Sequence, residues 1–74
     1  MANTPFTNKE INDFKLEAYR IGCEARENKE TLIVMNNPTY VEFSNKHGLS
    51  VHQSGDIDTD IAVTRAFNMG AFNE

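Results

Sequence analysis

A chain of 74 residues is expected to form one domain at most, with a single modest core, because a domain this small buries only about 60% of the surface of its unfolded chain. Seven Lys and Arg face eleven Asp and Glu, which gives a formal net charge of −4. Proteins that bind nucleic acid usually carry a basic stripe that neutralises phosphates. No such stripe is visible, and direct nucleic-acid binding is not expected.

The cysteine content and the hydropathy of the chain indicate its expected cellular compartment. The lone Cys23 rules out an internal disulfide and fits a reducing environment. Residues 1–20 contain no apolar run of signal-peptide length, and no stretch approaches the roughly 20 apolar residues of a membrane span. We expect a cytoplasmic protein, in the host cytoplasm if it is viral, without membrane association.

The strongest local signal is a helix start. Thr7 and Glu10 have the spacing of a capping box, and Phe6 and Ile11 have that of a hydrophobic staple. Apolar residues then recur at alternating intervals of three and four. They are Ile11, Phe14, Ala18, Ile21 and Ala25. This period predicts a helix from about residue 8 to 28.

The segment after this helix has strand character. Residues 31–35 (TLIVM) are short, apolar and rich in β-branched side chains, which favours a strand. Pro38 then biases Asn37 away from helical dihedral angles, so the chain breaks there.

Residues 39–48 fit two structures. In a strand, residues 39, 41 and 43 face one way and residues 40, 42 and 44 the other, and Gly48 closes a turn before a strand at 49–53. In a helix, Asn37 is the cap, Pro38 the first helical residue and Gly48 the C-terminal stop. We favour the strand, because Thr, Tyr, Val and Phe have high β-propensity and the alternation holds for six residues.

A second helix is expected near the C-terminus. Asp58 or Thr59 can cap it, and Gly70 is expected to end it. Small and apolar residues share one face. They are Ala62, Val63, Ala66, Phe67 and Gly70. The small ones would allow close approach to a sheet or to another helix.

These elements predict an α+β domain over residues 1–74, with a leader at 1–6 and a tail at 71–74. The long N-terminal helix packs on a small three-stranded antiparallel sheet (31–35, 39–44, 49–53), with the short C-terminal helix beside it. The alternative is an all-α, helix-turn-helix-like bundle in which residues 38–47 are helical.

One acidic string has the opening of a calcium loop. Asp56, Asp58 and Asp60 stand at alternate positions, as carboxylate ligands do in such loops. Ile61 then stands where the sharp turn needs Gly, and Phe67 where a bidentate Glu is needed. We therefore interpret the string as a solvated acidic segment that leads into a helix, and more specifically as an acidic edge available to a basic partner.

Residues for other site chemistry are missing. His47, His52 and Cys23 lack the spacing of zinc ligands, and neither histidine belongs to a nucleophile motif. The four glycines are scattered and form no phosphate-binding loop. We expect no catalytic residues, no cofactor and no metal, and hence no enzyme.

One segment resembles a known motif. Residues 41–51 (VEFSNKHGLSV) resemble the first helix and turn of a helix-turn-helix, and the matching positions are Ser44, Gly48, Leu49 and Val51. The resemblance implies a small transcriptional regulator. The implied recognition helix would hold Gly55 in its interior and would offer no Arg or Lys to DNA.

The main functional hypothesis is a small non-catalytic protein-binding module. We expect a viral or mobile-element accessory protein, an inhibitor or adaptor that blocks a basic, nucleic-acid-binding surface of a larger host protein or defence complex. Homodimerisation is a further way to bury surface. The expected partner contacts are Tyr40, Glu42, Asp56, Asp58 and Asp60. The alternative function is the helix-turn-helix-like regulator.

Overall fold

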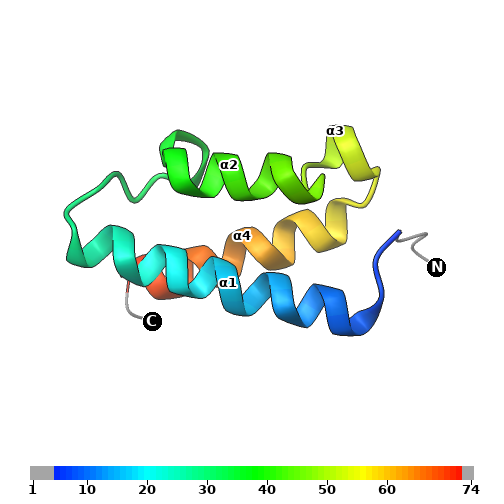
Figure 1. Cartoon of the computed structure of the whole chain (residues 1–74), viewed down its shortest axis with the longest axis horizontal. Coiled ribbons are helices and arrows are strands. Elements are labelled where there is room, and N and C mark those ends of the chain that lie inside the picture. The colour runs from blue at the N-terminus through cyan, green and yellow to red at the C-terminus, as the bar shows by residue number, and fades with distance from the viewer. Residues whose placement is uncertain (1–4, 73–74) are drawn as a thin grey trace.

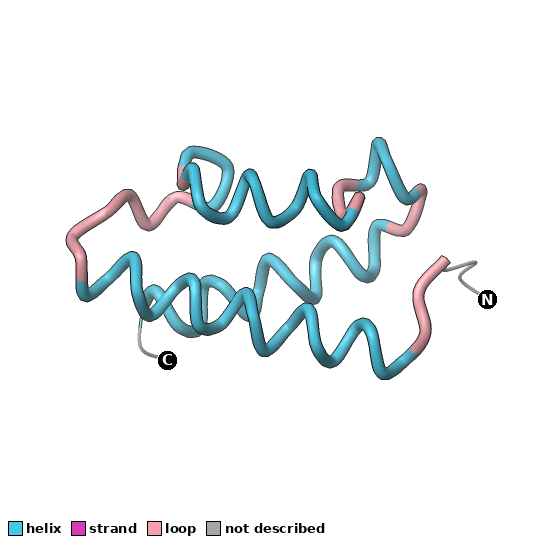
Figure 2. Tube along the Cα trace, viewed as in Figure 1, coloured by secondary structure: helices cyan, strands magenta, loops and turns pink. Residues whose placement is uncertain are grey.

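Helices make up all the regular structure between residues 5 and 72, the range that the computed structural model describes (Figure 1). In chain order they are α1 (Asn8–Glu27), the 3-10 helix η1 (Val34–Asn36), α2 (Pro38–His47), α3 (Val51–Ser54) and α4 (Ile57–Phe72). Figure 2 shows helices and loops but no strand in this range. The predicted α+β fold with a three-stranded sheet is therefore wrong, and the alternative helical interpretation of residues 38–47 is confirmed.

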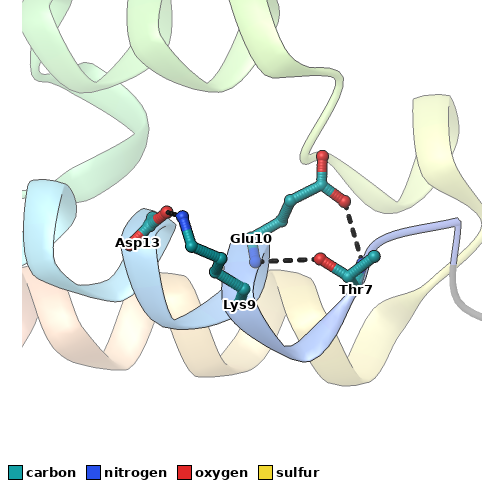
Figure 3. Close-up of polar contacts among 4 residues, drawn as sticks. All are labelled: Thr7, Lys9, Glu10 and Asp13. Atoms are coloured by element: carbon teal, nitrogen blue, oxygen red, sulfur yellow. Dashed lines mark hydrogen bonds and ion pairs between the residues drawn. The ribbon is translucent and has the colours of Figure 1, made fainter.

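Helix α1 begins where the capping box predicts. The Thr7 hydroxyl accepts from the Glu10 N–H at 3.1 Å, and the Glu10 carboxylate accepts from the Thr7 N–H at 2.9 Å (Figure 3). Two of the unpaired N–H groups at this end are thereby satisfied. The helix ends at Glu27, one residue from the predicted end.

The apolar segment 31–35 is not a strand. Its second half winds into η1, and the side chains of Ile33 and Met35 are 62% and 81% exposed. The buried Asn37 amide donates to the Thr31 carbonyl at 2.9 Å, which closes this loop against the start of α2. A strand needs a partner strand for its backbone groups. The neighbouring segment is helical and offers none.

Helix α2 begins and ends at the residues that were compatible with either a strand or a helix at 39–48. The Asn37 side chain accepts from the Tyr40 N–H at 3.0 Å, Pro38 is the first helical residue, and Gly48 adopts left-handed angles (φ 63°). The Leu49 N–H then bonds to the Ser44 carbonyl at 3.0 Å and closes the helix end. In this form Tyr40 and Phe43, three residues apart, share one face.

The predicted strand at 49–53 is the single turn α3, which Gly55 ends in left-handed geometry (φ 71°). Asp56 then caps α4, where Asp58 or Thr59 was expected. Its carboxylate accepts from the Thr59 N–H at 3.2 Å and from the Thr59 hydroxyl at 2.6 Å.

Helices α1 and α4 run parallel and pack backbone against backbone (Figure 1). A Cβ built on Gly22 would lie 2.2 Å from the Phe67 carbonyl oxygen, and one built on Gly70 would lie 2.2 Å from that of Tyr19. The predicted close approach of small α4 residues is realised against a helix. The prediction that Gly70 ends the last helix is wrong, because α4 continues to Phe72. Gly70 lies within the helix, where it lets the backbones of α1 and α4 approach each other.

Helix α2 runs antiparallel to this pair and covers one side of it (Figure 1). The buried apolar residues join all the long helices and the turn after α2. They are Ala18, Ile21, Ala25, Tyr40, Leu49, Val63, Phe67 and Ala71. Residues 1–4 of the expected leader and 73–74 of the expected tail lie outside the described range. Within it, no helix combines the length and apolarity needed to cross a bilayer.

Candidate functional site

A groove of about 560 Å³ lies between α1 and α2. We call it the acidic groove. Apolar residues form its floor, namely Phe14, Ile21 and Phe43, and polar residues line its rim, namely Glu10, Asp13, Glu17, Thr39, Glu42, Lys46 and His47. The members from each helix recur at intervals of three and four, so each helix contributes one face to the groove.

Aromatic rings form the floor. The Phe14 ring lies 6.3 Å from that of Phe43 and 5.2 Å from that of Phe6, with edge-to-face geometry in both pairs. The exposed His47 ring lies 5.1 Å from Phe14 and 5.2 Å from Phe43. Phe14 and Phe43 are only half-buried. The groove thus presents apolar aromatic surface that a partner side chain can cover.

The rim carries four carboxylates against one lysine. On α1 two of the carboxylates form local ion pairs. Asp13 pairs with Lys9 (Figure 3), with 3.7 Å between oxygen and nitrogen, and Glu17 pairs with Arg20 at 3.0 Å. Both ion pairs are well exposed.

On the opposite wall, α2 contributes the exposed Glu42, whose carboxylate makes no hydrogen bond or ion pair with any residue in the described range. The groove therefore has a negative rim that is only partly compensated.

Two of the five predicted contacts are not at the surface. Tyr40 is 5% exposed, and its ring packs 5.2 Å from that of Phe67. Its predicted projection from a strand into solvent is wrong, because α2 turns it into the core. Asp56 is 4% exposed and caps α4. The interpretation of Asp56 as part of an exposed acidic edge is therefore also wrong.

The other three contacts lie apart. Glu42 lines the acidic groove, whereas Asp60 lines a second groove and the exposed Asp58 lines neither of the two. The predicted contacts therefore do not form one surface. Asp58 and Asp60 are two residues apart on α4 and so differ by about 200° in direction, whereas Asp56 precedes the helix and is turned inward as its cap.

The second groove, about 400 Å³, lies between α4 and the segment that contains η1 and α2. It is lined by Val34, Met35, Tyr40, Val41, Ser44, Asn45, Ser50, Asp60 and Thr64. Burial raises the pKa of the Tyr40 phenol above its ordinary value. The hydrogen bond with Thr64 opposes this increase, and the negative charge of Asp60 adds to it. Tyr40 is thus a neutral hydroxyl at physiological pH.

Sequence reasoning missed most of the acidic groove. Glu10, Asp13 and Glu17 follow the helical period along the edge of the apolar stripe. Charged residues at helical spacing are typical of a solvated helix face, so they do not by themselves indicate a site. Their spacing was the available signal. Phe43 could not be placed, because its direction depends on α2 being helical.

The helix-turn-helix resemblance is met in its first half only. Helix α2 ends at Gly48 as the motif requires, but the following helix α3 has four residues and is stopped by Gly55. A helix that reads the major groove presents several side chains to base edges. Residues 51–54 contain no Arg or Lys, and the implied recognition helix is not formed there.

Metal chemistry has no assembled ligand set in the described range. Between residues 5 and 72, no three His, Cys, Asp or Glu side chains lie close enough together to hold an ion. Cys23 is a free, half-buried thiol. In comparisons with known proteins, no family model, no curated protein and no solved structure matches this chain.

Proposed function

We propose that this chain is a non-catalytic protein-binding module whose acidic groove holds a basic amphipathic helix of a larger protein. One observation carries the proposal: a half-buried aromatic floor and a rim of four carboxylates occur in the same groove. A helix that offers apolar side chains to the floor and Lys or Arg to the rim matches both features.

The floor supports an anchor of limited size. A groove of about 560 Å³ is within the range of pockets that enclose a small organic ligand. It therefore accommodates one or two apolar side chains of the partner. Covering Phe14 and Phe43 would complete the burial of two rings that the fold leaves half open. Such aromatic surfaces contribute strongly to interface energies.

The rim supports selection for cations. Exposed ion pairs such as Lys9–Asp13 and Arg20–Glu17 contribute at most about 1 kcal/mol. A partner cation can replace these lysine and arginine partners at little cost. Among residues 5–72 the Glu42 carboxylate has no partner to give up. Complementary charge of this kind raises the association rate and discriminates against acidic partners.

A protein that binds in this way acts stoichiometrically, as an inhibitor or an adaptor. Where the basic partner surface also binds nucleic acid, occupation by this acidic module would exclude the nucleic acid. The viral or mobile-element origin and the cytoplasmic location stay predictions from size, charge and cysteine content. The regulator alternative also stays a prediction, and no feature of the two grooves favours it.

The test uses a defined probe. An amphipathic peptide of about 14 Leu and Lys residues at helical spacing is titrated into the labelled protein and followed by amide chemical shifts. A scrambled peptide of the same composition controls for charge alone. We expect saturable shifts along α1 and α2 with the amphipathic peptide only, because the groove needs cations and apolar groups on one face.

Matched charge variants locate the interaction. The double variant Glu17→Gln/Glu42→Gln should weaken binding about tenfold and flatten its salt dependence, since it removes two rim charges. The control Glu24→Gln/Glu27→Gln changes the same net charge at α1 positions outside the groove lining. Equal weakening by both doubles, or equal binding of the scrambled peptide, would refute the assignment of the groove.

A further inference from the structure

We propose that the second groove, between α4 and the η1–α2 segment, is a binding site for an alkylammonium group. Its lining includes the apolar residues Val34, Met35 and Val41, which we call the wall. It also includes Tyr40, Thr64 and Asp60, whose side-chain oxygens lie close together. This site is separate from the acidic groove and does not depend on the function proposed for it.

The charge of the lining selects a cation. Asp60 is the one acidic residue in the lining of the second groove, whose other polar members are amides and hydroxyls. The Tyr40 hydroxyl lies 3.5 Å from the Thr64 hydroxyl, which lies 3.5 Å from one Asp60 oxygen. These long contacts leave lone pairs free for a stronger donor.

The arrangement of these oxygens favours ammonium over guanidinium. The second Asp60 oxygen accepts from the Val51 N–H at 3.3 Å, so the carboxylate does not present two free oxygens to a planar fork. An ammonium is compact and has three donors that can reach separate acceptors. Asp60, Thr64 and Tyr40 supply such acceptors in one place.

The wall selects an aliphatic chain. Met35 is 81% exposed beside the groove, and Val41 is also exposed. An unbranched chain of a few methylenes that lies along them would cover apolar surface while its ammonium reaches Asp60. The shared chemistry is that of a free alkylamine or of a lysine side chain of a partner protein.

Amide chemical-shift titration of the full chain with pentylammonium chloride tests the proposal. We expect saturable shifts at Val41, Val51 and Thr64. Pentanol, which has the same chain without the charge, should bind at least about tenfold more weakly, the loss typical of a hydrogen bond to a charged group. Ethylammonium should bind at least about fourfold more weakly, because each buried methylene contributes about that factor.

Two variants of α4 locate the charge. Asp60→Asn should raise the dissociation constant about tenfold, whereas Asp58→Asn removes the same charge from an exposed position outside the groove and should leave it unchanged. Asn can still accept from the Val51 N–H. If Asp60→Asn fails to fold, Thr64→Val removes one hydroxyl and should weaken binding about threefold.

Titration with N-acetyl-lysinamide, which carries the ammonium group on a peptide unit, distinguishes a lysine side chain of a partner protein from a free alkylamine. Binding at least as tight as that of pentylammonium assigns the site to a protein lysine, and binding of pentylammonium alone assigns it to a free amine. The proposal is overturned if neither probe gives saturable shifts. Equal weakening by Asp58→Asn and Asp60→Asn, or pentanol binding as tightly as pentylammonium, would overturn it too.

Discussion

Replacement of Gly22 by alanine tests how α1 and α4 are held together. The added Cβ would lie 2.2 Å from the Phe67 carbonyl oxygen and 2.8 Å from the Ala71 nitrogen. Ordinary contact begins near 3.4 Å. Both neighbours are backbone atoms, so no rotamer change relieves the clash. The two helices must separate by roughly 1 Å, which forfeits a quarter to a half of the dispersion energy of each contact that opens.

Two opposing terms set the size of the effect. Overpacking a close contact costs about 1–3 kcal/mol, and more where backbone must move. Alanine in a helix interior recovers about 1 kcal/mol relative to glycine. Because both clashing neighbours are backbone atoms, the cost lies at the upper end of its range, about 2–3 kcal/mol. We therefore expect a net destabilisation of about 1–2 kcal/mol, which lowers the melting temperature by about 4–16 °C in a domain of this size. The total stability of such a domain is about 4–11 kcal/mol, so the variant should still fold.

Thermal and urea denaturation followed by circular dichroism measure this change. Asn12→Ala, at an exposed position of the same helix, is the control and should change stability by less than about 0.5 kcal/mol. Gly70→Ala should act in the same direction, because its Cβ would meet the Tyr19 carbonyl oxygen. The double glycine variant should cost less than the two singles together, since helices already separated admit the second methyl group. A higher melting temperature for Gly22→Ala would refute the close-packing argument.

Variants at three further residues probe the caps of α2 and α4 and the hydroxyl of Tyr40. Asn37→Ala should cost about 2 kcal/mol in urea denaturation, because it removes the cap bond to the Tyr40 N–H and leaves the Thr31 carbonyl without its donor. Asp56→Ala should cost about 1–2 kcal/mol by the same assay, and Asp56→Asn less, because Asn also caps helices well. Folding raises the pKa of Tyr40, so its contribution to stability is complete below pH 10.0 and is lost as the pH rises from there through the raised value. Tyr40→Phe should therefore flatten the decline of unfolding free energy above pH 10.0, and an unchanged slope would contradict this origin.

Local sequence signals were sufficient to predict those features that depend on residues close together in the chain. The capping box at Thr7 and the apolar period after it predicted the start and the extent of α1. Small α4 residues also predicted a close approach to a neighbouring element, because a missing Cβ lets backbones meet wherever the partner lies.

For residues 39–47 the local sequence signals were not sufficient to predict the secondary structure. Their β-propensity and alternation favoured a strand, while Pro38 and Gly48 suited either structure. Tertiary packing favours the helix, because only helical spacing places Tyr40 against Phe67 and Phe43 beside Phe14. Tertiary contacts of this kind routinely outweigh propensity in a short segment.

The candidate sites depended on the same decision. The sequence by itself determined an acidic chain without a basic stripe or a metal-ligand pattern. Only the tertiary structure brought Glu42 opposite the α1 carboxylates and turned Asp56 inward as a cap. The physical reason is that a groove is made by two helices distant along the chain, whereas charge and periodicity are read within one segment at a time.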